Sequence, residues 1–243
     1  MRELKTYLVE GVVVRRRDFK EKDRILTLFT LERGRVDVLA KGARRPGSKL
    51  SYCSDLATVG SFKINSTRSL DIVLESKTLY QPEGAFGNIK KSSKIFSALQ
   101  IVDNLYREGD SYSMTYNSLK KLIYLASERD SKFGFVSFLR NVIIDHGIAP
   151  SLNECVLCQK EISKSSLVRF SLKGGIVHQE CARDDAIEIS PDEQRLLQSI
   201  FSNDFSDKTL VESNFNKQTY LKTFALLNDY FSWQFERQFL TIE

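Results

Sequence analysis

Apolar and polar residues alternate in short runs over the first 80 residues, which is the pattern of β-strands. Five short strands in so small a region predict a closed barrel, because closure removes the exposed edges of the sheet. Gly, Pro and Ser recur over Gly42–Asp55, so this longest irregular piece is predicted to be a loop. The five predicted strands, rich in β-branched residues, are Thr6–Arg17, Ile25–Leu31, Val36–Ala40, Leu56–Ile64 and Leu70–Tyr80.

From about residue 88 the apolar positions recur every three or four residues, which predicts helices. Gly147 and Pro150 predict the end of one helix, while Ser190, Pro191 and Glu193 predict the capped start of another. Because the apolar positions form stripes, we interpret them as the core of a helical bundle rather than as a ligand site. They are Ile95, Leu99, Val102, Tyr106, Tyr116, Leu119, Ile123, Ala126, Phe135, Phe138, Leu139, Val142, Ile143, Tyr220, Phe224, Leu227, Phe231, Phe235 and Phe239.

Composition fits a folded protein of the cell interior. The chain has 243 residues, of which 42% are hydrophobic, enough for one large domain or two small ones. No apolar run approaches the ~20 residues that cross a bilayer, and Arg2, Glu3 and Lys5 interrupt any apolar signal segment. We therefore expect a cytoplasmic protein with no membrane partner. In a reducing compartment the four cysteines favour metal binding or packing over disulfides.

Positive charge is concentrated in the first third of the chain. Residues 1–80 hold 17 of the 36 basic residues but 10 of the 31 acidic ones, so the remainder is slightly acidic. One run of charge is usually a solvated face, but three bunches in a small region indicate a polyanionic partner. The bunches are Arg15, Arg16 and Arg17; Lys20, Lys22 and Arg24; and Lys41, Arg44, Arg45 and Lys49.

Three cysteines and a histidine form a metal-ligand pattern between the helical blocks. Cys155 and Cys158 make a CxxC pair, His178 and Cys181 make an HxxC pair, and 19 residues separate the pairs. Each spacing lets one tight turn present two ligands, and thiolates with an imidazole favour tetrahedral Zn²⁺. A hairpin with its tip at Lys173-Gly174-Gly175 would bring the pairs together. All four positions are filled, so we expect one structural zinc ion that stabilises a segment without a core of its own.

The remaining cysteine and histidine are weaker candidates for a functional site. Cys53 is interpreted as a packed or exposed thiol, and His146 is an alternative zinc ligand that the HxxC spacing makes less favoured. The sequence motifs of phosphate-loop, dinucleotide-binding, serine-hydrolase and zinc-protease enzymes are absent, as is the zinc deaminase signature. With two histidines in the chain, acid–base catalysis near neutral pH has few candidates. We therefore expect a protein that is not an enzyme.

Two segments, EKDRILTLFTLERGRVDVLAKGARR and FLRNVIIDHGIAPSLNECVLC, resemble the most distinctive stretches of the RecO family of bacterial DNA repair and recombination mediators. The similarity in order and layout extends over nearly the whole chain. It implies an α+β protein with an N-terminal five-stranded OB-fold β-barrel over 1–80. An α-helical domain over 81–243 would follow, with the zinc module at about 151–185.

The resemblance also implies a function without catalysis. RecO-like proteins bind single- and double-stranded DNA (ssDNA and dsDNA) and anneal complementary strands. With RecR they help RecA to replace single-strand-binding protein, whose acidic tail they contact, so such a protein would associate with the nucleoid when it acts. On this basis we assign DNA binding to Arg15, Arg16, Arg17, Lys41, Arg44, Arg45 and Lys49, favouring the last four. For the tail, the helical domain offers Lys120, Lys121, Lys132 and Arg140 beside Phe133, Phe135 and Phe138.

The chain departs from the family pattern at two positions of the zinc module. His178 stands where Cys is usual, which preserves zinc binding, and Gln159 stands where Gly is common, which affects the turn after Cys158. Aromatic residues are sparse in 1–80, so DNA binding should depend on phosphate contacts and on salt. Two other functions stay open: an adaptor whose basic face meets an acidic protein, and an RNA-binding OB-fold protein.

Overall fold

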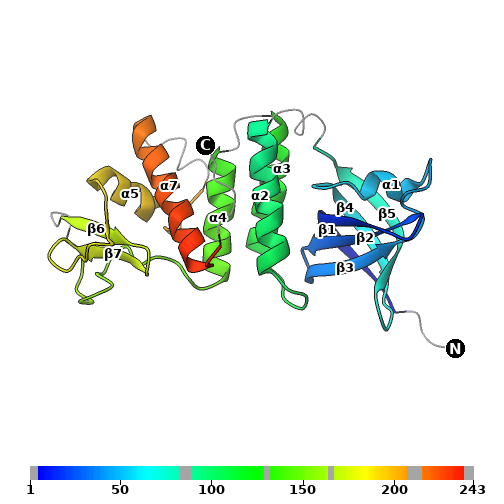
Figure 1. The fold of residues 1–243 in the computed structure, drawn as a ribbon, viewed down its shortest axis with the longest axis horizontal. Helices are drawn as coiled ribbons and strands as arrows, with labels where there is room; N and C mark the ends of the chain where they lie inside the picture. The colour runs from blue at the N-terminus through cyan, green and yellow to red at the C-terminus, as the bar shows by residue number, and fades with distance from the viewer. Residues whose placement is uncertain (1–4, 83–88, 129–131, 164–166, 207–214, 238–243) are drawn as a thin grey trace. The chain divides into compact units, whose positions relative to one another are not determined.

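The computed structural model describes residues 5–82, 89–128, 132–163, 167–206 and 215–237. Its N-terminal part is a closed barrel in the order β1-β2-β3-β5-β4 (Figure 1), which confirms the predicted five-stranded barrel. Neighbouring strands are antiparallel except β3 and β5, whose pairing is parallel. The strands are β1 (Thr6–Phe19), β2 (Asp23–Thr30), β3 (Gly34–Ala40), β4 (Val59–Asn65) and β5 (Asp71–Tyr80).

Alternation along the strands fills the barrel with aliphatic side chains. In β3, for example, Val36, Val38 and Ala40 are buried, while the residues between them are half-buried. The alternation on β1 is interrupted by a bulge between Val13 and Arg15, beyond which every residue of the strand is exposed. The bulge therefore separates the part of β1 that packs into the barrel from the part that presents charge to solvent.

The segment between β3 and β4 is only partly the loop that its composition predicts. Residues 41–48 form turns, but Lys49–Cys53 form a short helix, α1. Cys53 is buried, and its Sγ atom lies 3.0 Å from the Thr78 hydroxyl on β5, so this cysteine is a packed thiol. The loop lies against the β1–β2 turn, because the Gly42 N–H donates to Asp23 Oδ1 at 2.8 Å.

Helices dominate the rest of the chain. None of those in the described residues is long and apolar enough to cross a membrane. The predicted stripes before residue 147 are buried, apart from Ala126, whose side chain lies outside the described residues. The helices are α2 (Ile89–Leu105), α3 (Ser113–Glu128), α4 (Lys132–Asp145), α5 (Pro191–Ile200) and α7 (Lys217–Gln234).

The barrel, α2 and α3 form the first of two compact units, which spans residues 1–135. The Phe29 ring on β2 lies 5.0 Å from the Tyr106 ring and 6.1 Å from the Tyr116 ring, measured between centroids. On β1, Glu10 accepts hydrogen bonds from the Tyr116 hydroxyl at 2.9 Å and from the Lys120 ammonium at 2.7 Å. Aromatic packing and a charged network therefore join α2 and α3 to the outer face of β1 and β2.

The second unit begins at Val136 and contains a small sheet, α5 and α7. Strands β6 (Val168–Ser171) and β7 (Gly175–His178) form the predicted hairpin, and β8 (Ile187–Glu188) pairs with β6. Gly175 has a φ of 135°, and a Cβ atom there would lie 2.2 Å from the carbonyl oxygen of Ser151. Both the backbone conformation and the close approach therefore require glycine.

Sequence patterns located the ends of α5 better than the core stripe of α7. The predicted capping box at α5 is present, with the Ser190 side chain bonded to the Glu193 N–H and the Glu193 carboxylate bonded to the Ser190 N–H. On α7, the predicted core residues Tyr220 and Phe224 are half-buried and pack on each other. Phe235 is also half-buried, and Phe239 lies outside the described residues. The predicted core residues Leu227 and Phe231 are buried, and the rest of the buried stripe is Thr219, Thr223, Leu226 and Tyr230.

Candidate nucleic-acid interface and metal centre

The four predicted metal ligands come together in the second unit. One ligand atom each from Cys155, Cys158, His178 and Cys181 lies within 4.8 Å of all the others. The Sγ atom of Cys158 lies 3.4 Å from Nδ1 of His178. Ligand atoms of a tetrahedral zinc site, with Zn–S bonds of ~2.3 Å, lie roughly 3.5–4 Å apart. The size and the chemistry of this donor set therefore fit one metal ion.

Backbone hydrogen bonds bring the two ligand pairs together. The Val156 N–H, inside the CxxC turn, donates to the Ile176 carbonyl on β7 at 3.0 Å. Two residues later His178 ends β7, and the Cys181 N–H donates to the His178 carbonyl at 3.0 Å to close the second turn. The predicted alternative ligand His146 is not part of the four-residue group, and its Nδ1 lies 2.9 Å from a carbonyl oxygen of its own helix.

The CxxC turn contains a strained residue. Gln159 has a φ of 60°, and its N–H donates to the Cys155 carbonyl at 2.8 Å, which completes the turn around the ligands. A left-handed conformation of this kind costs a residue other than glycine roughly 1–3 kcal/mol. The glycine that the family resemblance places here would avoid this cost, so the departure at Gln159 is accommodated as backbone strain.

The surroundings of the cluster favour the thiolate of Cys155 and oppose that of Cys181. Burial disfavours the charged form of Cys155, but the N–H groups of Cys158, His178 and Leu157 outweigh it and lower its pKa to about 6. Hydrogen bonding to Cys158 raises the pKa of Cys181 to about 11. A bound cation would provide the positive charge that allows all three thiols to ionise.

The apolar cluster around the ligand residues is small. Within the described residues, its core consists of buried Cys155, Val177 and Ala186, with a few half-buried neighbours. So small a core agrees with the expectation that a metal ion contributes to folding.

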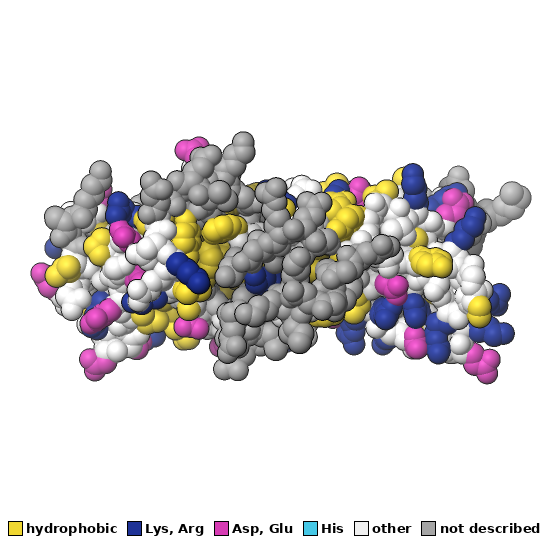
Figure 2. All heavy atoms as spheres, turned by 90° about the horizontal axis from the view of Figure 1, so that it is seen from above, with side chains coloured by type: hydrophobic (Ala, Val, Ile, Leu, Met, Phe, Trp, Pro, Cys, Tyr) yellow, Lys and Arg dark blue, Asp and Glu magenta, His cyan; other side chains and the backbone are white. Residues whose placement is uncertain are grey.

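All seven predicted DNA-binding residues are exposed on the barrel unit, where Figure 2 shows basic side chains gathered with acidic ones among them. Three of them form ion pairs: Arg15 with Asp103, Arg16 with Asp55, and Arg44 with Asp18. Across the described ranges, the other four have neither an ion pair nor a side-chain hydrogen bond. We call these four the unpaired set: Arg17, Lys41, Arg45 and Lys49.

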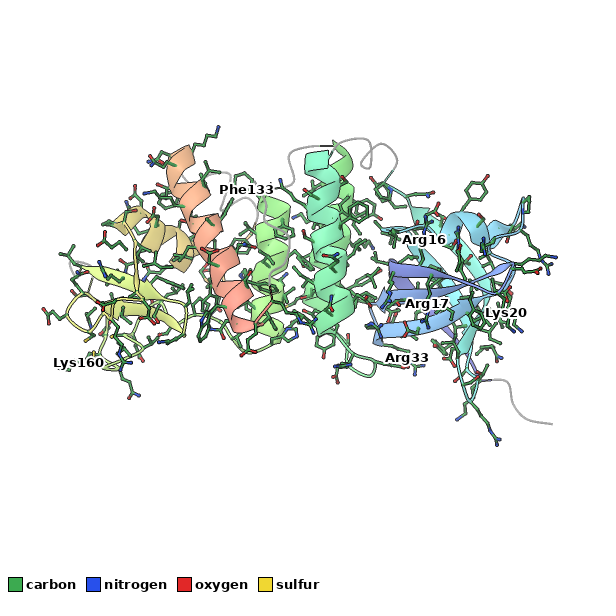
Figure 3. All side chains as sticks on the ribbon, viewed as in Figure 1. Arg16, Arg17, Lys20, Arg33, Phe133 and Lys160 are labelled. Atoms are coloured by element: carbon green, nitrogen blue, oxygen red, sulfur yellow. The ribbon has the colours of Figure 1, made fainter. Side chains whose placement is uncertain are left out.

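The three consecutive arginines of β1 do not form one patch, because side chains alternate along a strand. Arg15 and Arg17 lie opposite Thr27 and Ile25 of β2, whereas Arg16 lies opposite Leu26, which belongs to the barrel core. Figure 3 shows Arg16 nearer to α1 and Arg17 nearer to β3. Arg15 and Arg17 therefore lie on the outer face of the barrel, and Arg16 lies at one of its ends.

The outer face has a cleft of about 90 Å³ whose lining includes Arg15, Arg17 and Arg35 together with Asp37. Sequence reasoning missed Arg35, because it stands outside the basic bunches. Its Nε atom lies 3.0 Å from Asp103 Oδ1, and it also pairs with Asp37 at 3.5 Å. Alternation along β3 could have identified it, because Arg35 and Asp37 occupy the alternate positions that face outward. Guanidinium groups that line a cleft are suited to a phosphate, but those of Arg15 and Arg35 are paired with carboxylates here.

Five charged residues form a chain of ion pairs at the end of the barrel. Asp55 pairs with Arg16 and lies 3.8 Å from Arg24. Asp18 lies 3.4 Å from Arg24 and 3.3 Å from Arg44. The chain Arg16–Asp55–Arg24–Asp18–Arg44 joins β1, β2 and the 41–48 loop, and it compensates part of the positive charge of this surface.

Arg140, suggested for the acidic tail, is buried and its donors are used within the protein. It is 7% exposed, and its guanidinium donates to the Ile200 carbonyl at 2.6 Å and to the Ser202 carbonyl at 2.9 Å. Burial lowers the pKa of Arg140. The side chain therefore satisfies the C-terminal end of α5 and is not available to a peptide.

The other residues suggested for the tail are also partly occupied. Lys120 is bound to Glu10, and both Phe135 and Phe138 are buried in the core. The side chain of Lys132 lies outside the described residues. Lys121 is exposed and Phe133 is half-buried. The tail site therefore stays a prediction, without Arg140, Phe135 and Phe138.

Comparison with known proteins agrees with this architecture. The family model described as "Recombination protein O N terminal" matches residues 1–82, and the model described as "Recombination protein O C terminal" matches residues 87–241. Together they span the barrel and the helical region with its metal-ligand cluster.

Three relatives that match most of the chain share the description "DNA repair protein RecO". The protein from Desulforamulus reducens is 22% identical over 246 residues, which cover 99% of this chain and 94% of the relative. That from Symbiobacterium thermophilum is 29% identical over 179 residues, covering 72% and 71%. That from Bacillus subtilis is 27% identical over 206 residues, covering 81% and 78%. The chain therefore belongs to the RecO family of DNA repair proteins, which are non-catalytic mediators of recombination.

Proposed function

We propose that this chain binds ssDNA and dsDNA through its barrel and anneals complementary strands in recombinational repair. With RecR it helps to load RecA onto ssDNA covered by single-strand-binding protein, whose acidic tail it contacts. Its place of action is the bacterial cytoplasm, at the nucleoid. The chemistry needed is binding and alignment of strands, which requires no catalytic group.

The observation that carries this proposal is the cluster of exposed cations on the barrel. Seven basic side chains lie on or beside β1 and the 41–48 loop, and four of them belong to the unpaired set. Lys and Arg side chains without an acidic partner neutralise phosphates and release counterions, which gives affinity without sequence preference. A mediator that must handle any strand needs this kind of binding.

We also propose that the Cys3His group holds one structural Zn²⁺. Cys155, Cys158, His178 and Cys181 supply three soft thiolates and an imidazole, the donor set that favours zinc in tetrahedral geometry. The four protein ligands would fill the coordination sphere, so the ion would stabilise the module rather than react with a substrate.

The deciding experiment is strand annealing on ssDNA coated with single-strand-binding protein. We expect the full chain to accelerate annealing, and we expect the double variant Lys41→Ala/Arg45→Ala to lose most of that acceleration. In binding assays the same variant should flatten the slope of log K against log salt by about 0.7 per lost phosphate contact with ssDNA. The control is Lys63→Ala/Lys77→Ala, which removes two other barrel lysines: half-buried Lys63 of β4, paired with Glu75, and exposed Lys77 of β5.

The two other functions predict different results. An adaptor for an acidic protein would not bind bare oligonucleotides at about 150 mM salt, the physiological range. An RNA-binding protein would prefer an RNA strand to the DNA strand of the same sequence. Equal loss of annealing in the control variant would place the DNA on another part of the barrel.

A further inference from the structure

We propose that Tyr52 of α1 is the stacking surface for an unpaired base of a DNA strand bound to the barrel. This inference rests on the proposed DNA-binding function and adds a base contact to its phosphate contacts. At 70% exposure, Tyr52 is the most exposed aromatic residue among those that the structure describes. Within those residues its side chain makes neither a hydrogen bond nor a ring contact, so the ring is open to a ligand.

The other aromatic rings of residues 1–80 are already in use. Phe29 and Phe62 are buried. Each of the remaining three has a cation or a second ring against it, at 4.2 to 5.4 Å from its centroid: Tyr7, Phe19 and Tyr80. Proteins that hold single strands stack bases on aromatic rings beside a basic groove. Tyr52 is the ring of the barrel that is left for such a contact.

The short helix α1 holds Tyr52 in place although its side chain is exposed. On one side of it in the sequence, Cys53 is buried, with its Sγ atom 3.0 Å from the Thr78 hydroxyl of β5. On the other side, half-buried Leu50 packs against the barrel core. A tyrosine has few rotatable bonds, and its backbone is fixed here, so little freedom is lost when a base stacks on the ring.

Three cations of the unpaired set lie in the same segment as Tyr52. Lys49 stands three residues before it on α1, and residues three apart are neighbours on the surface of a helix. Lys41 and Arg45 belong to the turns that lead into α1, where the Ser48 N–H donates to the Arg45 carbonyl at 3.1 Å. A strand whose phosphates bind these cations therefore brings its bases close to the ring.

The surroundings of the ring suit a base better than a protein partner. An aromatic residue that anchors a protein interface is surrounded by other contacts that exclude water, and the core of an interface is poor in charge. Over residues 41–58, all of which the structure describes, Tyr52 is the one exposed large hydrophobic residue, and cations accompany it. A duplex keeps its bases stacked and paired, so it can use the cations but not the ring.

Three DNA probes and two variants of the full chain test this contact. The probes are an oligo-dT strand, an abasic strand of the same length and a duplex; the variants are Tyr52→Leu and Tyr52→Phe. Tyr52→Leu should weaken oligo-dT binding roughly 5- to 150-fold, the range for loss of one stacked aromatic ring. It should leave the other two probes and the salt slope unchanged, because stacking releases no counterions. Tyr52→Phe, which keeps the ring, should bind like the parent.

A fluorescent version reports on the ring directly. The sequence has a single tryptophan, Trp233, so Tyr52→Trp in a Trp233→Phe background places the only indole on α1. Oligo-dT should quench this indole and the abasic strand should not. Equal quenching by the abasic strand would overturn the proposal, because the indole would then report bound charge. Quenching by polyglutamate but not by oligo-dT would overturn it in favour of an acidic protein partner.

The remaining outcomes separate this contact from the function on which it rests. If the parent binds none of the three DNA probes, the proposed DNA binding fails and the base contact fails with it. If the parent binds all three but Tyr52→Leu binds oligo-dT equally well, the base contact alone is refuted. Equal weakening on all three probes would also refute it, because the ring would then act through the arrangement of the cations.

Discussion

Removing the negative charge of Asp18 should strengthen the DNA binding that we propose for the barrel. Asp18 lies beside two arginines, 3.3 Å from Arg44 and 3.4 Å from Arg24, and its side chain is 57% exposed. In Asp18→Asn the arginines lose a competing anion, and Arg44 becomes available to a phosphate. The substitution is nearly isosteric, so it changes charge without changing the shape of the β1–β2 turn.

The size of the effect follows from the exposure of the pair. The Asp18 carboxylate and a phosphate bound to Arg44 would lie roughly 6 Å apart, and two like charges at this distance in water repel by ~0.7 kcal/mol. Removing this repulsion corresponds to about a threefold lower Kd. One additional phosphate contact would also steepen the salt slope for ssDNA by up to about 0.7. The lost ion pairs are at the surface and contribute about 0.2–1 kcal/mol to folding. Stability should therefore change little while affinity rises.

Fluorescence anisotropy with a labelled oligonucleotide, titrated between about 50 and 200 mM salt, measures both quantities. The matched control is Glu75→Gln, which removes the same charge from an exposed pair with Lys63 on the other side of the barrel. Unchanged or weaker binding by Asp18→Asn would refute the reasoning. An equal gain in Glu75→Gln would show that net charge, not the release of Arg44, is responsible.

Four further changes have defined outcomes. Protein purified without added metal should contain close to one equivalent of zinc, and less than about a tenth of an equivalent would contradict the site. The variant Cys155→Ser should lose the zinc and unfold at a lower temperature, whereas His178→Cys should keep the zinc. Gln159→Gly should stabilise the second unit by about 1 kcal/mol in urea unfolding, because it relieves the left-handed strain. Arg140→Met should destabilise the fold by roughly 3 kcal/mol through lost hydrogen bonds to the α5 carbonyls, without changing DNA affinity. The hydrogen bond from Lys120 holds the pKa of Glu10 in the folded protein below its ordinary value. The stability that Glu10 contributes is therefore fully present above about pH 4.3, and it is lost as the pH falls through the lowered pKa of the folded state. In thermal unfolding, Glu10→Gln should reduce this loss of stability in acid.

Local sequence patterns predicted the structure correctly where the geometry depends on residues close together in the sequence. Alternation and turns predicted the five strands of the barrel, and the capping box predicted the start of α5. The CxxC and HxxC spacings predicted which four residues would come together, because each pair lies on one turn and a hairpin of four-residue strands joins them. In each case the residues that determine the geometry are close in sequence.

Partners distant in sequence could not be predicted. The charge of Arg140 predicts a surface position, yet the residue is buried, because the carbonyls of Ile200 and Ser202, at least 60 residues away, accept hydrogen bonds from its guanidinium. The aspartates that pair with the basic bunches include Asp103 of α2, which lies far from β1 in the sequence. Periodicity on α7 selected aromatic residues, whereas packing buried Thr219 and Thr223. Charge and ring size describe what a residue can do, but tertiary contacts decide which face it occupies.

Ion pairing within the barrel limits how tightly the proposed DNA interface can hold a strand. Each phosphate that binds Arg16 or Arg44 must displace the carboxylate of Asp55 or Asp18, whereas the unpaired set binds without such competition. A strand held mainly by exposed, salt-sensitive contacts dissociates readily, because each contact is weak and solvent exchanges with it. An annealing protein requires this property, since it must release the duplex that it forms. The same argument predicts that substituting the aspartates strengthens the proposed binding more directly than adding arginines does. Variants that bind more tightly should anneal more strands per encounter but release the duplex more slowly.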